Sequence, residues 1–295
     1  MKGISVLRWI CLVMAIGALF VLLIPACSGD DDDDDDDDSV GSGTLIFTAN
    51  GEEFVREGFT SMDGWDLLFN NLYLNISGPT AYQEVEEESG GMDPLHAGHP
   101  HDDIPEGAAH EALTGAFFVD LTLGDGPTEL GRVEGAAAGN YNRLNFDIVH
   151  VDSESDGYIA DHEGFSIVLI GTADKGEDHI DFTIRFTEEM RYINCGPNDD
   201  VGVVADGGEG TAEATFHFDH VFGDEGEDPG EEHGVNEIAL GFDPLAALAE
   251  EGVLDVTQDE LGAGLLTGAD YNTLIDALRT IGHSGEAHCD MGTFD

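Results

Sequence analysis

Histidine is concentrated in three stretches of this sequence, and its imidazole nitrogens are good ligands for zinc and copper. The first stretch, PLHAGHPHDDIPEGAAHE at residues 94–111, holds four of the chain's twelve histidines. Its Gly and Pro content and the lack of a supporting element predict a mobile loop. We therefore expect its histidines to be accessory metal ligands or solvated loop residues. They are His96, His99, His101 and His110.

Two shorter stretches are better candidates for a metal site. In FHFDH (216–220), strand alternation places His217 and Asp219 on one face, with His220 just beyond the strand end. GHSGEAHC (282–289) directly follows a predicted helix. Neither stretch supplies three converging ligands alone, so we predict that the two meet and bind zinc or copper; solvated histidines are the alternative. The predicted ligands are His217, Asp219, His220, His283 and His288.

The N-terminus has the pattern of a secretory signal. Residues 1–26 carry two positive charges followed by an apolar run that is short for a membrane span and ends in IPAC. This resembles the bacterial lipoprotein box, which implies cleavage before Cys27 and a lipid on that cysteine. Residues 27–43 contain nine consecutive aspartates and predict a hydrated tether. We expect a lipid-anchored extracytoplasmic protein, periplasmic or at the cell surface; an uncleaved single-span anchor is the alternative.

The number and positions of the cysteines agree with a location outside the cytoplasm. Cys11 leaves with the signal and Cys27 is the expected lipid site, which leaves Cys195 and Cys289 for the folded domain. Two such cysteines outside the cytoplasm most often pair, and this pair would hold the C-terminal segment against the body. The bridge would bring the last two histidine stretches within reach of each other. The competing interpretation makes Cys289 a metal ligand beside His288.

The sequence DSESDGYIADHE at residues 152–163 has the spacing of a calcium-binding loop. Oxygen ligands at positions one, three, five, seven and twelve would converge on one large cation, and Gly157 at position six would allow the sharp turn. The predicted calcium ligands are Asp152, Glu154, Asp156, the carbonyl of Tyr158, and Glu163. A plain hairpin that turns at Asp156 and Gly157 is the alternative.

The net charge restricts the partners of this chain. The sequence holds 63 acidic residues against 9 Lys and Arg, for a formal charge of -54. This charge excludes nucleic acid as a natural partner and disfavours contact with anionic lipid. Bound cations or ambient salt must offset the self-repulsion. Contact with a membrane is therefore expected only through the lipid on Cys27.

The domain that follows the tether is predicted to be mainly β. Over residues 44–239, apolar residues recur with period two in at least seven segments bounded by Gly, Asn and Asp. In HIDFTIRF (179–186), for example, Ile180, Phe182, Ile184 and Phe186 share one face. Such a series predicts a two-sheet antiparallel β-sandwich.

Residues 240–295 change to a helical period and predict a small helical unit packed on the sandwich. Asp243 is placed as an N-cap, with Pro244 first in a helix that stops before Gly252. Thr257 and Glu260 have the spacing of a capping box. A last helix, DYNTLIDALRTIG (270–282), is expected to end at its glycine.

Four sequence segments resemble the secreted copper-binding domains of the MbnP-like type. They are TLIFTANGEEF, GWDLLFNNLYLNISG, FFVDLTLG and GAAAGNYNRLNFDIV. Asp120, Gly139 and Tyr141 agree best with the family pattern. The long histidine-rich insertion and the helical C-terminus depart from it. The resemblance implies an extracytoplasmic metal-associated protein that works beside a protein partner.

These features together predict a metal-binding protein for zinc or copper buffering, delivery or uptake, with calcium stabilising one loop. The alternative is a calcium-stabilised surface module for adhesion or assembly, with its histidines incidental. The sequence has no phosphate-binding loop, no nucleophile elbow and no HExxH motif, so an enzyme is not expected.

Overall fold

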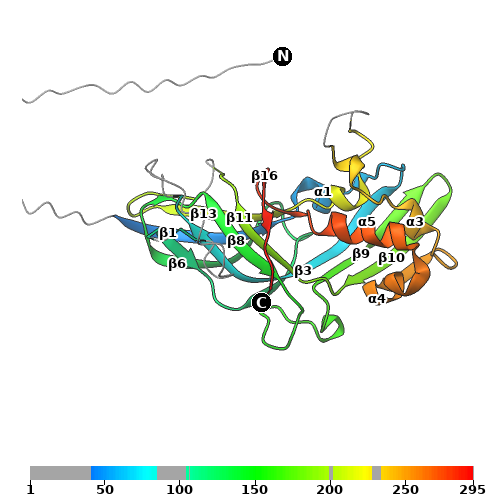
Figure 1. Ribbon diagram of the computed structural model, residues 1–295, viewed down its shortest axis with the longest axis horizontal. Coiled ribbons are helices and arrows are strands. Elements are labelled where there is room, and N and C mark those ends of the chain that lie inside the picture. Colours follow the sequence, from blue (N-terminus) through cyan, green and yellow to red (C-terminus); the bar gives the residue numbers. More distant parts are fainter. Residues whose placement is uncertain (1–40, 85–103, 106, 199–201, 228–233, 295) are drawn as a thin grey trace, which may run out of the picture. The chain divides into compact units, whose positions relative to one another are not determined.

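The protein is mainly β, which confirms the predicted fold class (Figure 1). The computed structural model describes residues 41–84, 104–105, 107–198, 202–227 and 234–294. Residues Val40–Asp295 form one compact unit, so the boundary expected at residue 240 lies inside it. The predicted signal peptide and the part of the tether that precedes Val40 lie outside the described residues.

A five-stranded sheet carries the histidines of interest. Its strand order is β16-β15-β13-β1-β6. The bounds are β1 (Ser42–Asn50), β6 (Thr128–Ala137), β13 (Glu209–Phe216), β15 (Gly282–Ser284) and β16 (Ala287–His288). A separate two-stranded sheet joins β7 (Gly139–Asn140) to β12 (Val203–Val204).

A ten-stranded sheet makes up most of the remaining structure. Its main path is β14-β10-β9-β3-β8-β11-β17, and three more strands, β2, β4 and β5, pair with β3. The bounds are β2 (Phe59–Thr60), β3 (Asp66–Tyr82), β4 (His110–Ala112), β5 (Ala116–Asp120), β8 (Arg143–Ile148), β9 (Ile167–Lys175), β10 (Asp178–Phe186), β11 (Met190–Cys195), β14 (Val253–Thr257) and β17 (Asp290–Met291).

Short helices connect these strands. They are α1 (Glu52–Glu57), α2 (Asp219–Phe222), α3 (Asp243–Ala246), α4 (Gln258–Glu260) and α5 (Gly268–Leu278), with 3-10 turns at η1 (Ala160–His162) and η2 (Val235–Glu237) and a π turn at η3 (Leu261–Leu265). In Figure 1, α3, α4 and α5 lie near β9 and β10, whereas β1, β6 and β13 lie at the other end of the unit. None of the helices in the described ranges is long and apolar enough to span a membrane.

The sheets are mixed, where a purely antiparallel sandwich was expected. β13 runs parallel to β1, and β14 runs parallel to β10. Parallel neighbours need a long connection, and each of these pairs is separated by many other elements along the chain. Period-two alternation marks a strand but is the same for both directions, so the sequence pattern could not distinguish them.

Aromatic side chains join the two large sheets and fix α2 in place. Phe146 on β8 and Phe216 on β13 meet edge to face at 5.6 Å between ring centroids. Phe218, the N-cap of α2, and Phe222, its last residue, both contact Phe69 on β3 at 6.3 Å between ring centroids. Because all of these rings are buried, their packing in the core holds the segment that carries His217 and His220 in place.

The C-terminal segment has fewer helical residues than the sequence pattern indicated. The predicted capping box of Thr257 and Glu260 is present. The expected N-cap at Asp243 is wrong: Phe242 takes that position, and the Asp63 carboxylate accepts hydrogen bonds from the backbone N–H groups of Phe242 and Asp243. α3 ends after one turn, and the chain then forms β14 within the predicted helical unit.

The last helix also ends earlier than predicted. α5 stops at Leu278 with Arg279 as its C-cap, and Gly282 begins β15 instead of closing the helix. The strand β6 was missed because its Glu- and Gly-rich sequence lacks an apolar alternation. Pairing with distant parts of the chain therefore set the secondary structure of these segments and outweighed their weak local sequence patterns.

A disulfide joins Cys195, at the end of β11, to Cys289, between β16 and β17. The C-terminal segment contributes β15 and β16 to the five-stranded sheet and β17 to the ten-stranded sheet. The bridge therefore pins the segment where it passes from one sheet to the other. The two cysteines are 94 residues apart in the sequence, so the bond removes much of the freedom of the unfolded chain.

Replacing both cysteines, with Cys195→Ser and Cys289→Ser combined, should lower the free energy of unfolding by about 2–4 kcal/mol, because the unfolded chain regains that freedom. Urea denaturation followed by circular dichroism measures this loss. The two single variants are the controls, since each also breaks the bond and should show a similar loss. An unchanged urea midpoint in the double variant would contradict the stabilising role.

Candidate metal centre

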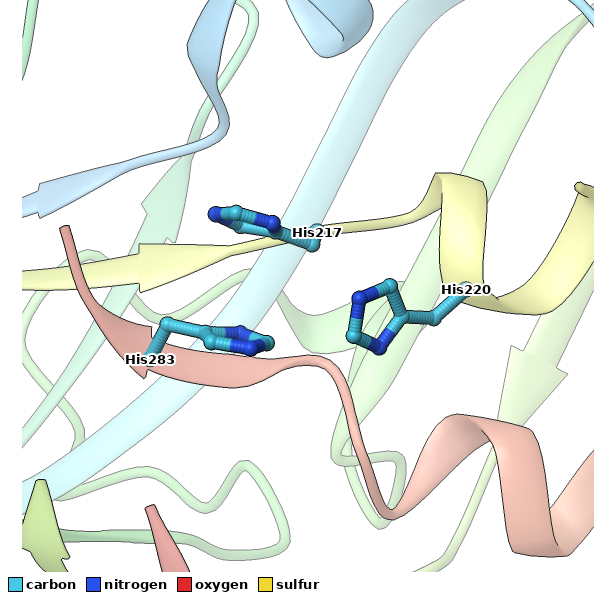
Figure 2. A group of neighbouring side chains, drawn as sticks. All are labelled: His217, His220 and His283. Carbon is cyan, nitrogen blue, oxygen red and sulfur yellow. The ribbon is translucent and has the colours of Figure 1, made fainter. Parts of the chain in front are cut away.

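Three histidines from two distant parts of the chain meet at the edge of the five-stranded sheet (Figure 2). His217 follows β13, His220 lies in α2, and His283 lies in β15. One ligand nitrogen from each lies within 4.8 Å of the others. The rings of His217 and His283 stack at 4.2 Å between centroids, and His220 meets His283 edge to face at 5.0 Å. Three imidazoles on one point are a ligand set for zinc or copper.

Backbone pairing brings the two histidine stretches together. Thr215 and Phe216 on β13 pair with His283 and Gly282 on β15. The backbone N–H of His217 then donates to the Ile281 carbonyl at 2.9 Å. The chain turns directly afterwards into α2, which places the His220 side chain next to the start of β15 (Figure 2).

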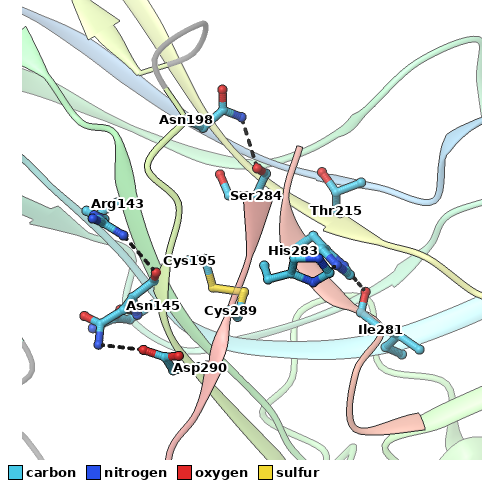
Figure 3. Close-up of a disulfide and its surroundings, with 12 residues drawn as sticks. Arg143, Asn145, Cys195, Asn198, Thr215, Ile281, His283, Ser284, Cys289 and Asp290 are labelled. Atoms are coloured by element: carbon cyan, nitrogen blue, oxygen red, sulfur yellow. Dashed lines mark hydrogen bonds between the residues drawn. A yellow bond between two sulfur atoms is a disulfide. The ribbon is translucent and has the colours of Figure 1, made fainter. Parts of the chain in front are cut away.

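The Ile281 carbonyl also sets the tautomer of His283. The Nδ1 atom of this ring lies 3.1 Å from the carbonyl oxygen, which can only accept a hydrogen bond (Figure 3). Nδ1 therefore carries the proton, and the lone pair is on Nε2. This is the arrangement in which a histidine is oriented for metal binding by a partner on its other nitrogen.

Thr280 acts in the same way on His220. The Thr280 hydroxyl donates its single proton to the Ala277 carbonyl at 2.8 Å. It can therefore only accept from the His220 Nδ1 atom, 3.0 Å away. His220 then also carries its proton on Nδ1 and presents the lone pair of Nε2. Hydrogen bonds to Thr280 and Ile281, which follow α5, thus leave Nε2 as the ligand nitrogen of both buried histidines.

Burial keeps these two rings neutral. Desolvation, with a further contribution from the charge of His217, lowers the pKa of His283 to about 3 and that of His220 to about 4. A metal ion binds the neutral imidazole, so protons do not compete with it at these rings near pH 7.

His288 is the fourth histidine at this point. Its Nδ1 atom lies 2.9 Å from the Nε2 atom of His283, and its side chain is exposed. It directly precedes Cys289 and pairs with His283 across β15 and β16, so the disulfide holds it beside the buried rings. Its strand β16 returns along β15 through a two-residue turn in which Gly285 has a φ of 56°. A side chain at Gly285 would also clash with Asn198.

A second group of ligands shares His217. Ligand atoms of Glu52, His217 and Glu286 lie within 4.8 Å of one another. The Nε2 atom of His217 is 3.7 Å from the Oε2 atom of Glu52, and it is buried with no hydrogen-bond partner among the described residues. Burial raises the pKa of Glu52, the charge of His217 lowers it, and the charge of Glu286 raises it further.

The predicted ligand Asp219 lies outside both groups. The expected strand alternation is wrong here, because β13 ends at Phe216 and Asp219 is the first residue of α2. The strand ends because the chain then forms a helical turn, in which the N–H groups of Phe222 and Gly223 donate to the carbonyls of Phe218 and Asp219. Asp219 is nevertheless buried, its Oδ1 atom has no hydrogen-bond partner in the described part of the chain, and burial raises its pKa.

The predicted calcium ligands are not gathered on one point. In the described part of the chain, two groups of three ligand atoms lie within 4.8 Å of one another, and neither group includes a residue of the 152–163 loop. The Asp152 carboxylate accepts from the backbone N–H of Glu154, and Glu163 accepts from the hydroxyl of Tyr158. Asp156 bonds through its backbone to Phe118 and Ala116. Calcium binding by this loop stays a prediction.

His110 is the accessory histidine that lies in the described part of the chain, and it does not belong to either group of candidate ligands. His110 is exposed on β4, and its Nδ1 atom lies 3.2 Å from the Ala108 carbonyl oxygen. The other three, His96, His99 and His101, lie outside the described residues, as does the expected lipid site Cys27.

Sequence reasoning missed Glu52, Thr280 and Ile281. Glu52 follows an Asn-Gly pair and has a left-handed backbone conformation, φ 59°, that no sequence period reveals. The Asn50 side chain accepts its backbone N–H at 2.8 Å. Thr280 and Ile281 looked like the end of a helix, and only their distance from the rings assigns them a role.

No protein-family model matches this chain, and neither any curated protein nor any solved structure is a significant match. The resemblance to MbnP-like domains stays a prediction. Asp120, one of its residues, accepts backbone hydrogen bonds from Leu72 and Thr122 and so fixes the end of β5 against β3. The geometry of the histidines is therefore the basis for assigning a function.

Lowering the pH should destabilise the metal-free protein over the range from about 6.5 to about 4. His220 and His283 have folded-state pKa values of about 4 and about 3, below the value of 6.5 in an unfolded chain. The unfolded chain therefore binds more protons in this range, and each histidine should remove roughly 1.4 kcal/mol of unfolding free energy per pH unit. Above pH 6.5 this loss is absent. Urea denaturation in EDTA at several pH values measures it.

The variants His220→Gln and His283→Gln should each reduce this pH slope. Glu52 and Asp219 act in the opposite direction because their pKa values are raised, so the informative quantity is the difference between parent and variant. His110→Gln, at an exposed histidine on β4, is the matched control and should keep the parent slope. A His283→Gln slope equal to that of the parent would refute burial of a neutral ring.

Proposed function

We propose that this chain is a lipid-anchored extracytoplasmic protein that binds a zinc or copper ion at His217, His220 and His283 and serves in metal buffering, delivery or uptake. The main support for the metal site is that the two buried histidines, His220 and His283, each donate a hydrogen bond from Nδ1 to a group that can only accept one. This arrangement leaves the Nε2 lone pair available on both rings, that of His283 beside the Nδ1 atom of His288, and one ligand nitrogen of each ring lies within 4.8 Å of one on His217.

The size of the group supports an ion of this kind. In a tetrahedral zinc site with Zn–N bonds of about 2.0–2.1 Å, neighbouring nitrogens are about 3.4 Å apart. The three nitrogens lie within 4.8 Å, so small rotations of the side chains bring them to binding distance. His288 is close enough to become a fourth ligand if its bond to His283 is exchanged for the metal.

The location of the protein follows from its sequence features. The apolar N-terminal segment, Cys27 and the aspartate tether together support a lipid anchor followed by a hydrated spacer. The Cys195–Cys289 bond agrees with an oxidising compartment. A metal-binding domain held at a membrane surface in this way suits capture or storage of ions and their transfer to a protein partner.

Isothermal titration with Zn²⁺ and with Cu²⁺, together with native mass spectrometry, tests the site. The parent should bind one ion tightly, and His217→Ala and His283→Ala should each weaken its affinity at least about 100-fold, because a buried ligand is lost. His179→Ala removes an exposed histidine bonded to Asp174 and is the matched control. Equal zinc and copper content in parent and both site variants would refute the proposal.

Thr280→Val tests the orienting hydrogen bond separately from the ligands. The variant keeps all histidines but removes the acceptor for the His220 Nδ1–H, so affinity should fall about 10–100-fold. Thr122→Val, which loses a hydroxyl bonded to Asp120, is the matched control. Unchanged affinity in Thr280→Val would show that Thr280 does not orient the ligand.

A further inference from the structure

We infer that Glu52, His217 and Glu286 form a second cation site, which captures a divalent ion at the surface and passes it through the shared His217 to the buried histidines. The destination of the ion rests on the proposed function, whereas the second site itself does not. A single imidazole can serve both groups in turn because it has two ring nitrogens.

The position of His217 supports a site on its Glu52 side. Its Nε2 atom is buried without a hydrogen-bond partner among the described residues. The nearest carboxylate oxygen, on Glu52, is 3.7 Å away, which is too long for a hydrogen bond. The ligand atom of Glu286 lies within 4.8 Å of both. A cation that bonds to all three would satisfy the orphaned nitrogen.

The local charge also favours a cation. The negative charges of Glu286, Asp219 and Glu213 all act on the half-buried Glu52. Asp219 is itself buried, with one carboxylate oxygen unpartnered in the described part of the chain. Carboxylates held together in partly desolvated surroundings repel one another, and a divalent ion would offset that repulsion.

Burial increases from the second group to the first. Glu286 is exposed, Glu52 and His217 are half-buried, and His220 and His283 are buried. Glu52 also lines an open hollow of about 330 Å³ together with Asn50 and Arg56, so a hydrated ion can reach it from solvent. The carboxylates are thus the accessible ligands, and the imidazoles are the enclosed ones.

Ligand chemistry gives the transfer a direction. Carboxylate oxygens bind zinc-like ions, but a site with three neutral imidazoles is the stronger one for zinc or copper. An ion held by Glu52, Glu286 and His217 can therefore exchange its oxygen ligands for nitrogen without leaving the protein. Negative charge around an open entrance also raises the rate at which cations arrive.

The test uses the full chain and Co²⁺ alone, because the visible absorption of Co²⁺ reports the ligands that it binds. Stopped-flow mixing measures loading, and native mass spectrometry counts the ions. The combined Glu52→Gln and Glu286→Gln variant should bind one ion fewer than the parent and load the histidines at least about tenfold more slowly. The combined Glu177→Gln and Glu251→Gln variant, which removes two charges from exposed turns away from the candidate site, should behave like the parent.

A second variant separates this inference from the proposed function. His220→Gln combined with His283→Gln should lose the tightly bound ion and keep a weaker one. If it binds the same ions as the parent, the histidine centre fails, and the carboxylate site is still judged from its own variant. If the Glu52→Gln, Glu286→Gln variant matches the Glu177→Gln, Glu251→Gln control in both ion count and loading rate, the capture site is overturned. Circular dichroism of each variant in EDTA checks that the fold is retained.

Discussion

Two residue pairs between β13 and β15 return the C-terminal segment to the edge of the five-stranded sheet, and the candidate metal centre depends on this contact. The same contact places the Ile281 carbonyl where it receives both the backbone N–H of His217 and the ring N–H of His283. The disulfide then fixes the segment as it passes to the ten-stranded sheet. Backbone pairing and one covalent bond thus hold the ligands before any ion is involved.

Polar groups inside this centre are arranged for binding more than for stability. The buried imidazoles have strongly lowered pKa values, and the buried Nε2 atom of His217 has no hydrogen-bond partner among the described residues. Both features cost free energy that apolar side chains at these positions would not. The aromatic core beneath α2 offsets this cost by anchoring the turn that carries His220. Such an arrangement is typical of a ligand site, where a bound ion satisfies the lone pairs.

Much of the fold could be predicted from apolar periodicity. The segments that became β1, β3, β5, β8, β9, β10, β11 and β13 all show it, since each has one buried face. Strand direction was not predicted, because alternation is the same in parallel and antiparallel pairs. β6 was missed because its Gly- and Glu-rich sequence lacks alternation, and β14 because its five residues lie between two segments with helix signals. The helix proposed to run from Asp243 to just before Gly252 was too long, because the chain turns at Glu250, whose backbone pairs with Val253 at the start of β14.

The sequence by itself determined the types of ligand and their local spacing: histidines at 217, 220, 283 and 288, each pair close along the chain, and two cysteines able to bring the pairs together. Only the tertiary structure decided which atoms converge. It excluded Asp219 from both groups by ending β13 at Phe216, and it added Glu52 from α1. The tautomer and the burial of each histidine, and the lack of a hydrogen-bond partner for a ring nitrogen, depend on neighbours that are distant in sequence. A local sequence pattern carries no information about such contacts.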